Sequence, residues 1–342
     1  MTVPSRLQDA RKFLETIDLR RVESDIASET RAQLVIIGPV NSGKSTLFNQ
    51  LKGQKLSNVS AVPGTTREVI SEQFGPFWLV DTPGMGEVAG SQTTATALGA
   101  IQNASVAVLV LDASAGVRQS DADLYSQVQG MGIPVVIALN KIDLIEHDFR
   151  RVISDVEVKL RTPVIPISAK KGTGLADKLL PAIIEAHPRM AVTIGRALPR
   201  YRQIAARRVI RESAWVAAVM AAEPIPVLEI PFLIGVQVRM LLRLAAIYGQ
   251  MMGVARAREL LSAIAGGMAI RYATQELAKL IPGPGWLIAG ATAWTGTTAL
   301  GSAAVAFFQS SGKLTTTELR DLYRRFRKKG SAPPAELVGD DD

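Results

Sequence analysis

The sequence contains no cysteine, only two histidines and few aromatic residues, which make up 5% of its 342 residues. Without cysteine the chain can form no disulfide framework, cysteine-ligated zinc site or redox dithiol, and this composition fits a reducing compartment. His147 and His187 are isolated and are expected to face solvent, and neither the histidines nor the acidic residues show metal-ligand spacing. The scarcity of aromatic side chains also disfavours a surface that stacks nucleobases.

A cleaved secretory signal is not visible either, because no long apolar stretch follows the polar residues 1–7. We therefore expect residues 31–190 to act in the cytoplasm. The net charge of +8 lies entirely within residues 191–342, which hold 19 basic and 11 acidic side chains. Such a basic excess attracts nucleic acid or anionic lipid, and the charge alone does not choose between them.

The sequence pattern divides the chain into four parts. Residues 1–30 include a predicted amphipathic helix over 5–27, where charged and apolar residues alternate at helical spacing. Residues 31–190 alternate short β-branched runs with helical stretches. Residues 191–329 are first arginine-rich and then apolar, which predicts a helical domain. The polar tail 330–342 ends in acidic residues and is expected to be disordered.

The alternating part predicts an α/β fold with a doubly wound mixed sheet of about six strands, followed by a mainly α-helical hydrophobic domain. An edge strand over 67–73 is expected to pair antiparallel with 76–80 through Gly75 and Pro76. The buried strands are expected at residues 33–37, 76–80, 105–111, 134–139 and 163–167.

Two apolar hairpins are predicted in the C-terminal half. The stretch 286–308 has 23 residues without a charge, enough to span a bilayer at about 1.5 Å per residue, although it is rich in Ala, Gly and Thr. Glu223 and Glu229 make deep insertion of the first hairpin costly. Hairpins that enter a membrane and core helices of a soluble domain therefore both remain open. The predicted arms are 214–222 with 230–247, around a break at 224–226, and 260–281 with 286–308, around a break at 282–285.

A phosphate-binding loop is indicated at 38–45, where the pattern G-x-x-x-x-G-K-S lies between the strand 33–37 and a helix expected to begin near Lys44. Its glycines let backbone N–H groups turn toward phosphates, Lys44 reaches the β and γ oxygens, and Ser45 can bind magnesium. The nucleotide-binding residues predicted here are Gly38, Asn41, Ser42, Gly43, Lys44, Ser45 and Thr46.

A second motif, Asp81-Thr82-Pro83-Gly84, directly follows the strand 76–80. It places a carboxylate at the C-terminal end of a strand, the edge at which α/β sheets bind ligands. We expect Asp81 to hold magnesium through water. Gly84 is expected to donate its backbone N–H to the γ-phosphate, so that loss of this phosphate releases the following segment.

Two further motifs indicate a guanine site, one after the strand 134–139 and one after 163–167. Asp143 can accept two hydrogen bonds from the guanine N1–H and exocyclic amine, a donor pair that adenine lacks. Lys141 is expected to lie over the base, and the second motif to offer a backbone N–H to the guanine O6. The predicted ligands are GTP and GDP with Mg²⁺, and the predicted guanine-site residues are Asn140, Lys141, Asp143, Ser168, Ala169 and Lys170.

In this order the four motifs resemble those of the Era/TrmE/Der group of translation-factor-related GTPases, over about residues 30–190. The resemblance implies hydrolysis of GTP to GDP and phosphate. It also implies that 63–67 is the first switch, with Thr66 completing the magnesium site in the GTP state. Met85 stands where Ras-like proteins carry a water-orienting glutamine, and a thioether cannot orient water by a strong hydrogen bond. Slow intrinsic hydrolysis is therefore expected.

Asn41 offers another route to hydrolysis. In TrmE-like and Der-like relatives the matching asparagine helps to hold a potassium ion, K⁺, beside the β and γ phosphates, where a cation would do the electrostatic work of an arginine finger. The alternative is that Asn41 only caps the loop. The predicted catalytic residues are thus Lys44, Thr66, Gly84 and Asn41, and the predicted metal ligands are Ser45, Thr66 and Asp81.

The favoured interpretation is a GTP-dependent switch on the cytoplasmic side of a membrane, where basic clusters bind anionic headgroups. The segment 224–249 resembles an uncharacterised hydrophobic domain that follows Era-like GTPase domains in bacterial and plastid proteins. One alternative is a cytoplasmic Era-like GTPase that binds RNA or the ribosome, although no KH-type Gly-x-x-Gly loop with suitable neighbours follows residue 190. A dynamin-like membrane remodeller is a lesser alternative, and a GTP-dependent homodimer is a further candidate partner. The sequence names no effector.

Overall fold

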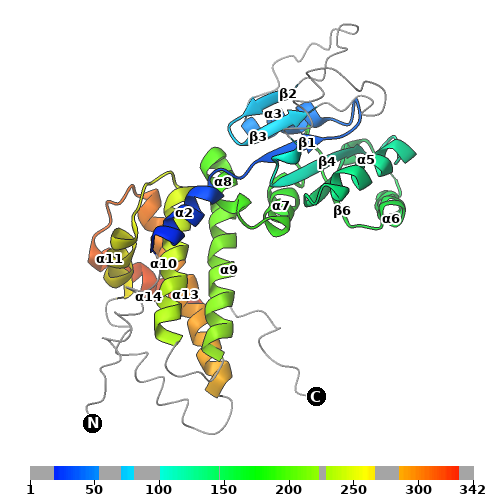
Figure 1. Ribbon diagram of the computed structural model, residues 1–342. Helices are drawn as coiled ribbons and strands as arrows, with labels where there is room; N and C mark the ends of the chain where they lie inside the picture. The colour runs from blue at the N-terminus through cyan, green and yellow to red at the C-terminus, as the bar shows by residue number, and fades with distance from the viewer. Residues whose placement is uncertain are drawn as a thin grey trace, which may run out of the picture. The chain divides into compact units, whose positions relative to one another are not determined.

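The computed structural model describes residues 19–53, 71–80, 101–145, 147–222, 229–265 and 285–330 (Figure 1). The chain divides into two units. Residues 29–204 form the first, which we call the α/β unit, and residues 1–28 together with 205–342 form the second, the helical unit.

The α/β unit is built on a six-stranded mixed sheet with the order β2-β3-β1-β4-β5-β6. All neighbouring strands are parallel except β2, which pairs antiparallel with β3. This sheet confirms the predicted fold class. The strands are β1 (Leu34–Ile37), β2 (Ser71–Phe74), β3 (Phe77–Val80), β4 (Val106–Asp112), β5 (Val135–Asn140) and β6 (Val164–Pro166).

The edge hairpin turns at Gly75, whose φ of 55° lies in the left-handed region that favours glycine. The rings of Phe74 and Phe77 stack across it with centroids 6.4 Å apart. The antiparallel pairing predicted here is confirmed, and the described part of the edge strand begins at Ser71 because residues 67–70 lie outside the described residues.

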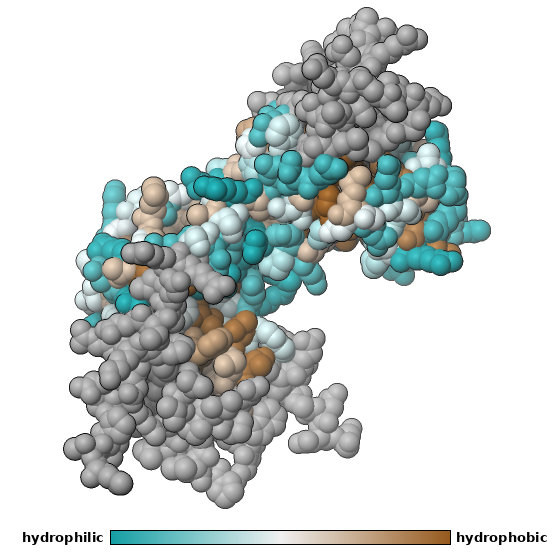
Figure 2. Space-filling view, viewed as in Figure 1, coloured by the Kyte–Doolittle hydropathy of each residue, from teal (hydrophilic) through white to brown (hydrophobic). Residues whose placement is uncertain are grey.

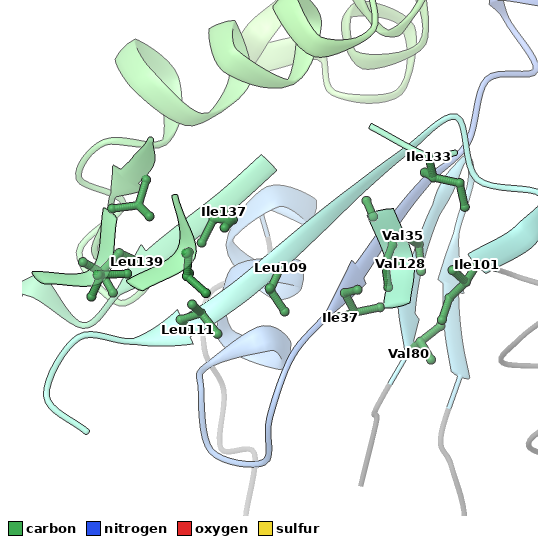
Figure 3. Close-up of a cluster of buried hydrophobic side chains, with 14 of the residues drawn as sticks. Val35, Ile37, Val80, Ile101, Leu109, Leu111, Val128, Ile133, Ile137 and Leu139 are labelled. Carbon is green, nitrogen blue, oxygen red and sulfur yellow. The ribbon is translucent and has the colours of Figure 1, made fainter. Parts of the chain in front are cut away.

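Helices cover both faces of the sheet, as the alternation of β-branched runs and helical stretches predicts (Figure 1). Side chains on one strand face opposite sides in turn, so Val35 and Ile37 point toward α5 and α6 while Leu34 and Ile36 point away from them. Figure 3 shows this cluster, in which Val128 of α5 packs among the strand residues. The helices of the unit are α3 (Lys44–Lys52), α5 (Gln119–Gly130), α6 (Phe149–Leu160), α7 (Leu180–Ala186) and α8 (Met190–Ala197), with short turns η1 (Ile142–Leu144), η2 (Leu175–Leu179) and η3 (Pro199–Tyr201).

The helical unit contains no strand among its described residues. Its helices are α10 (Glu229–Ile247), α11 (Val254–Ala265), α13 (Gly285–Gln309) and α14 (Thr316–Lys329), and the unit division falls within α2 (Leu19–Glu29) and α9 (Arg202–Ala222). The Glu23 carboxylate of α2 accepts a hydrogen bond of 3.2 Å from the Val254 backbone N–H at the start of α11. Thr315 and Glu318 form a capping box that begins α14.

Small residues let α9 and α13 approach each other closely. A Cβ on Gly290 would lie 3.2 Å from the Ala218 carbonyl oxygen, and a Cβ on Gly301 would lie 2.6 Å from Cγ1 of Ile210. Ala214 and Ala218 pack against Trp294 at the same contact. The charge-free, Ala- and Gly-rich composition of 286–308 thus corresponds to a helix that packs on α9. No helix among the described residues combines the length and the apolar character that crossing a bilayer requires.

Several boundaries of the predicted helical segments agree with the ends of the described helices. The first hairpin arms correspond to the end of α9 at Ala222 and to α10, and the basic segment 318–329 lies in α14. The predicted N-terminal helix is described only from Leu19 onward. The break at 224–226, most of the arm 260–281, the break at 282–284 and residues 331–342 lie outside the described residues.

Candidate functional site

The phosphate-binding loop predicted at 38–45 connects β1 to α3 at the C-terminal edge of the sheet. Gly38 has a φ of 143°, and a Cβ at this position would lie 2.2 Å from the Val110 carbonyl oxygen. Gly43 has a φ of 93°, and a Cβ there would lie 2.2 Å from Nδ2 of Asn140. Each glycine is therefore required both by its backbone conformation and by a close neighbour. Asn41 also adopts a left-handed conformation, with a φ of 64°.

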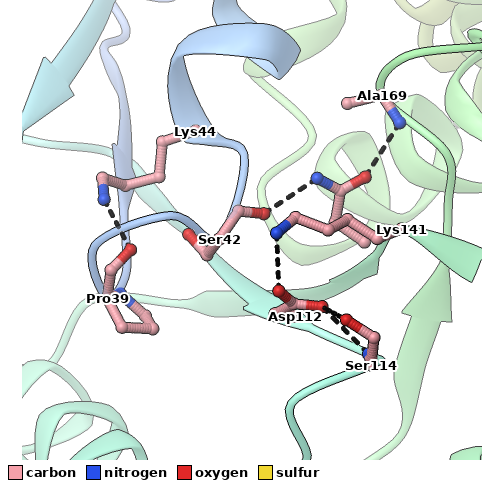
Figure 4. Close-up of polar contacts among 8 residues, drawn as sticks. Pro39, Ser42, Lys44, Asp112, Ser114, Lys141 and Ala169 are labelled. Carbon is pink, nitrogen blue, oxygen red and sulfur yellow. Dashed lines mark hydrogen bonds and ion pairs between the residues drawn. The ribbon is translucent and has the colours of Figure 1, made fainter. Parts of the chain in front are cut away.

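The side chains of this loop differ in their exposure. Lys44 is buried, and its Nζ donates a hydrogen bond of 2.7 Å to the Pro39 carbonyl oxygen across the loop (Figure 4). Ser42 is fully buried, and its Oγ has no hydrogen-bond partner among the described residues. Asn41 and Ser45 are exposed and Thr46 is half-buried, so these three polar side chains lie at the surface of the loop and of the first turn of α3.

Asn140 links the phosphate-binding loop to the second predicted guanine motif. Its Nδ2 donates a hydrogen bond of 2.8 Å to the Ser42 carbonyl oxygen. Its Oδ1 accepts one of 2.8 Å from the Ala169 backbone N–H. Asn140 is 2% exposed, and buried polar groups without a partner are costly, so these two bonds hold the two loops in a fixed relation.

The other guanine motif residues lie around the same edge. Lys141 follows β5, and Asp143 lies in the turn η1 directly after it. A hydrogen bond from the Ser168 side chain holds the pKa of Asp143 below its ordinary value, and the charges of Lys171 and Lys170 act in the same direction against the effect of burial. The Ser168 Oγ also accepts a hydrogen bond of 3.1 Å from the Lys171 backbone N–H. Ser168 and Ala169 are buried, whereas Lys170 is exposed.

The sequence analysis missed Asp112, the last residue of β4. Its Oδ2 accepts a hydrogen bond of 2.6 Å from the Lys141 Nζ (Figure 4). Its Oδ1 accepts bonds from the Ser114 backbone N–H and Oγ, at 2.9 Å and 2.6 Å. The available signal was a charged residue that ends a strand of buried hydrophobic residues. Asp112 therefore belongs to the site through its contact with Lys141.

The structure brings together the phosphate-binding loop, the Asn140–Asp143 segment and the Ser168–Lys170 segment. The predicted residues Thr66, Asp81 and Gly84, together with Met85, lie outside the described residues. Within the described ranges no group of histidine, acidic or cysteine residues is arranged to hold a metal ion.

One expectation about the histidines is wrong. His147 is exposed as predicted, but His187 is half-buried at the end of α7. Its Nδ1 is buried and has no hydrogen-bond partner in the described parts of the chain, and this burial lowers its pKa. The chain turns from α7 into α8 at this point, where the His187 backbone N–H donates to the Ile183 carbonyl oxygen and the His187 carbonyl oxygen accepts from the Met190 N–H.

A mixed sheet with a glycine-rich loop leading into a helix, and guanine motifs at the same edge, define a P-loop GTPase fold. Residues 33–141 match the family described as "50S ribosome-binding GTPase". This part of the chain is therefore similar to the GTPase domains of that family. Residues 189–320 match a family described as a domain of unknown function, which confirms the resemblance seen at 224–249.

Several curated proteins are similar to the GTPase part of the chain. GTPase Der of Acidithiobacillus ferrooxidans is 35% identical over 184 residues, covering 48% of this chain and 41% of that protein. The tRNA modification GTPase MnmE of Moorella thermoacetica is 34% identical over 205 residues, covering 57% and 42% respectively. GTPase Era of Halothermothrix orenii is 34% identical over 150 residues, covering 41% and 50%. The chain thus spans half or less of the length of these relatives.

Two solved structures cover a similar share of this chain. Era of Aquifex aeolicus, bound to GDP and aluminium fluoride, is 27% identical with a TM-score of 0.37, covering 54% of this chain and 67% of that one. The FeoB G-domain of Methanococcus jannaschii is 30% identical with a TM-score of 0.32, covering 45% and 96%.

Proposed function

We propose that the protein binds GTP and hydrolyses it to GDP and phosphate, and that the change of nucleotide acts as a molecular switch. The observation that carries this proposal is the Asn140 side chain, which ties the phosphate-binding loop to the Ser168–Lys170 segment. The phosphate-binding loop is thereby held at a fixed distance from the segment proposed to contact guanine. The match of residues 33–141 to a GTPase family supports the same ligand.

Each part of this site has a role in the proposal. Lys44 would contact the β and γ phosphate oxygens, together with backbone N–H groups at the start of α3. The lowered pKa of Asp143 keeps its carboxylate ionised at neutral pH, so that it can accept two hydrogen bonds from guanine. Ser168 orients that carboxylate, and the segment around Ala169 would contact the guanine O6.

Magnesium fits the oxygen donors proposed for it. Ser45 presents an exposed hydroxyl in the first turn of α3, and Mg²⁺ prefers oxygen ligands with water completing its coordination. Thr66 and Asp81 are the other proposed ligands. When bound, the ion would neutralise charge on the β and γ phosphate oxygens.

Nucleotide competition tests the guanine selectivity. Fluorescent GDP bound to the full chain should be displaced by GTP but not by ATP. Asp143→Asn should weaken GDP binding by at least about 100-fold. The asparagine amide replaces one acceptor oxygen with an NH₂ group, which is a donor and cannot accept a hydrogen bond from the guanine N–H groups. Asp155→Asn is the matched control, since Asp155 is exposed on α6 in the same unit. Equal displacement by ATP, or unchanged GDP binding in Asp143→Asn, would contradict the proposal.

The proposed potassium ion is tested by turnover. Asn41 is exposed at the turn of the loop, where its side-chain oxygen could contact a cation beside the phosphates. GTP hydrolysis should be slow in sodium buffer and faster in potassium buffer, and Asn41→Ala should remove the difference. Equal rates in both buffers in the unsubstituted protein would reject potassium and leave the loop-capping role for Asn41.

We further propose that the helical unit binds the anionic surface on the cytoplasmic side of a membrane. In the N-terminal half of α9, Arg207 and Arg211 are exposed, and in its C-terminal half Val216 and Val219 are each 37% exposed. Phe232 near the start of α10 is also 37% exposed. Figure 2 shows hydrophobic residues at the surface of this unit. Helices that carry both exposed basic and exposed apolar residues are typical of the interface of a charged bilayer.

Helix α14 adds to the basic surface of the same unit. It buries Leu319 and Tyr323 and exposes five cationic side chains. Each such residue near an anionic surface contributes about 1 kcal/mol of attraction. The exposed cations are Arg320, Arg324, Arg325, Lys328 and Lys329.

Flotation with vesicles of phosphatidylglycerol and phosphatidylcholine tests this proposal. The full chain should float with these vesicles and not with phosphatidylcholine alone. The double variant Val216→Asp with Val219→Asp should lose flotation, whereas Val158→Asp, at a position 73% exposed on α6, should not. Failure to float, with recovery only in ribosomal fractions of cell extracts, would overturn membrane binding and favour the RNA alternative.

A further inference from the structure

We propose that Asp112 is a positioning residue for guanine binding, which acts by fixing the Lys141 side chain. This inference rests on the proposed nucleotide site and adds a residue to it. The sheet sets the geometry, because Asp112 and Asn140 are paired neighbours at the ends of β4 and β5. Lys141 is the next residue after β5, so its backbone begins beside the Asp112 carboxylate.

The carboxylate is held so that one oxygen is directed at Lys141. Ser114 donates two hydrogen bonds to Oδ1 of Asp112, from its backbone N–H at 2.9 Å and from its Oγ at 2.6 Å. Oδ2 remains for the Lys141 Nζ, at 2.6 Å. The side chains of Lys141 and Asp112 are only 29% and 15% exposed, so solvent screens this ion pair less than it screens pairs on the open surface.

The protonation state of the pair supports the same role. Burial alone would raise the pKa of Asp112, but the hydrogen bonds from Lys141 and Ser114, with the Lys141 charge, outweigh it and hold the pKa below its ordinary value. The carboxylate is therefore ionised whenever the protein is near neutral pH.

Lys141 also has an unusual backbone, with a φ of 65° in the left-handed region. This conformation turns the chain from β5 into η1, which carries Asp143. With its backbone fixed at one end and its ammonium fixed at the other, the four-carbon stem of Lys141 has little freedom. A lysine side chain that is already ordered costs less conformational entropy when a base packs on it than a free one does.

The proposal makes a prediction opposite to that of simple charge attraction. A nucleotide is an anion, so removal of a nearby carboxylate should strengthen binding if only long-range charge mattered. If Asp112 acts by holding Lys141, its removal should weaken binding instead. The sign of the change thus separates the two explanations.

A double-mutant cycle on the full chain tests the inference with fluorescent GDP as the probe. Asp112→Asn should raise the Kd by about 5- to 20-fold, mostly through faster dissociation, in line with loss of a charged hydrogen bond. Lys141→Met should weaken binding as well, and Asp112→Asn should have no further effect in the Lys141→Met background. Asp112→Glu should restore part of the affinity, and Asp155→Asn should leave it unchanged.

The possible outcomes separate this inference from the proposed function. Tighter or unchanged GDP binding in Asp112→Asn, while the unsubstituted chain binds GDP, overturns the role of Asp112 alone. Additive effects of Asp112→Asn and Lys141→Met overturn it too, because they show that Asp112 does not act through Lys141. No GDP binding by the unsubstituted chain overturns the proposed nucleotide site and this inference with it.

Discussion

The α/β unit and the contact between α9 and α13 in the helical unit are packed by different kinds of residue. The α/β unit buries branched side chains such as Val35, Leu109 and Ile137 between its sheet and helices. The helical unit brings α9 and α13 together through residues with little or no side chain, such as Ala218 and Gly301. Large side chains keep secondary structures apart and fill the space, whereas small ones let backbones approach.

The two units also use buried polar groups differently. In the α/β unit, the buried Asn140 connects loops at one edge of the sheet, where a ligand can reach them. In the helical unit, buried polar groups connect the bodies of helices: Gln237 bonds to Thr297, and Arg243 pairs with Glu212 at 2.9 Å. Buried polar groups thus join loops in one unit and helices in the other.

The largest effect is expected for Gly38→Ala in the α/β unit. A Cβ would lie 2.2 Å from the Val110 carbonyl oxygen, and a side chain strains the backbone at a φ of 143°. We expect a loss of about 4 kcal/mol in the free energy of unfolding of this unit. Amide hydrogen exchange measured on peptides from each unit should show faster exchange in residues 29–204, and equal acceleration in both units would contradict the comparison.

Asn140→Ala should come next, because it leaves the Ser42 carbonyl and the Ala169 N–H buried without their partner. We expect a loss of about 3 kcal/mol, together with loss of GDP binding. Urea unfolding and fluorescent GDP titration measure the two effects. Gln127→Ala, at an exposed position on α5, is the control and should change neither quantity.

Gly301→Ala should break the close packing of the helical unit at a smaller cost. Its Cβ would meet the Ile210 side chain, which can move, so we expect a loss of about 1–2 kcal/mol. The second substitution Ile210→Ala should recover part of this loss because it removes the Cγ1, Cδ1 and Cγ2 atoms that the new Cβ meets, although Ile210→Ala alone destabilises. Failure of the pair to recover any stability would show that Ile210 does not limit the approach of α13.

The smallest effect is expected in mild acid, which should lower the stability of the unit that contains the histidines and not that of the other. Both histidines lie in the α/β unit. The folded pKa of His187 is lowered by burial, so the unfolded chain binds its proton more readily. Stability of this unit should therefore fall as the pH decreases through the ordinary histidine pKa of about 6.5, by less than about 1 kcal/mol. His187→Gln should remove the decrease, and the helical unit should not respond over this interval.

The sequence was sufficient for the sheet and for three of the site's segments because the signals are local. Gly38 follows β1, Lys44 begins α3 and Asn140 ends β5, and the pattern of each of these elements is visible within a few residues. The contact between Asp112 and Lys141 joins residues 29 positions apart, and neither its distance nor its partners follow from a motif. Parallel pairing of β4 and β5 is what creates it.

The helical unit was harder to predict for a related reason. The charge-free stretch 286–308 fitted both a membrane hairpin and a core helix, because its hydropathy is the same in each. Only the partner decides its packing, and Gly301 meets Ile210 across α9 and α13, elements far apart in the sequence. Likewise the half-burial of His187 does not follow from its residue type.

The Asn140 amide has a consequence for how the protein can change over evolution. Because the Asn140 side chain is bonded to both loops, a substitution that moves the backbone of one loop also moves the other, and neither loop can change independently. A change in ligand preference is therefore easier to reach by substituting Asp143, which lies in η1, or Lys141, which directly follows β5, than by substituting Asn140, whose amide joins the loops.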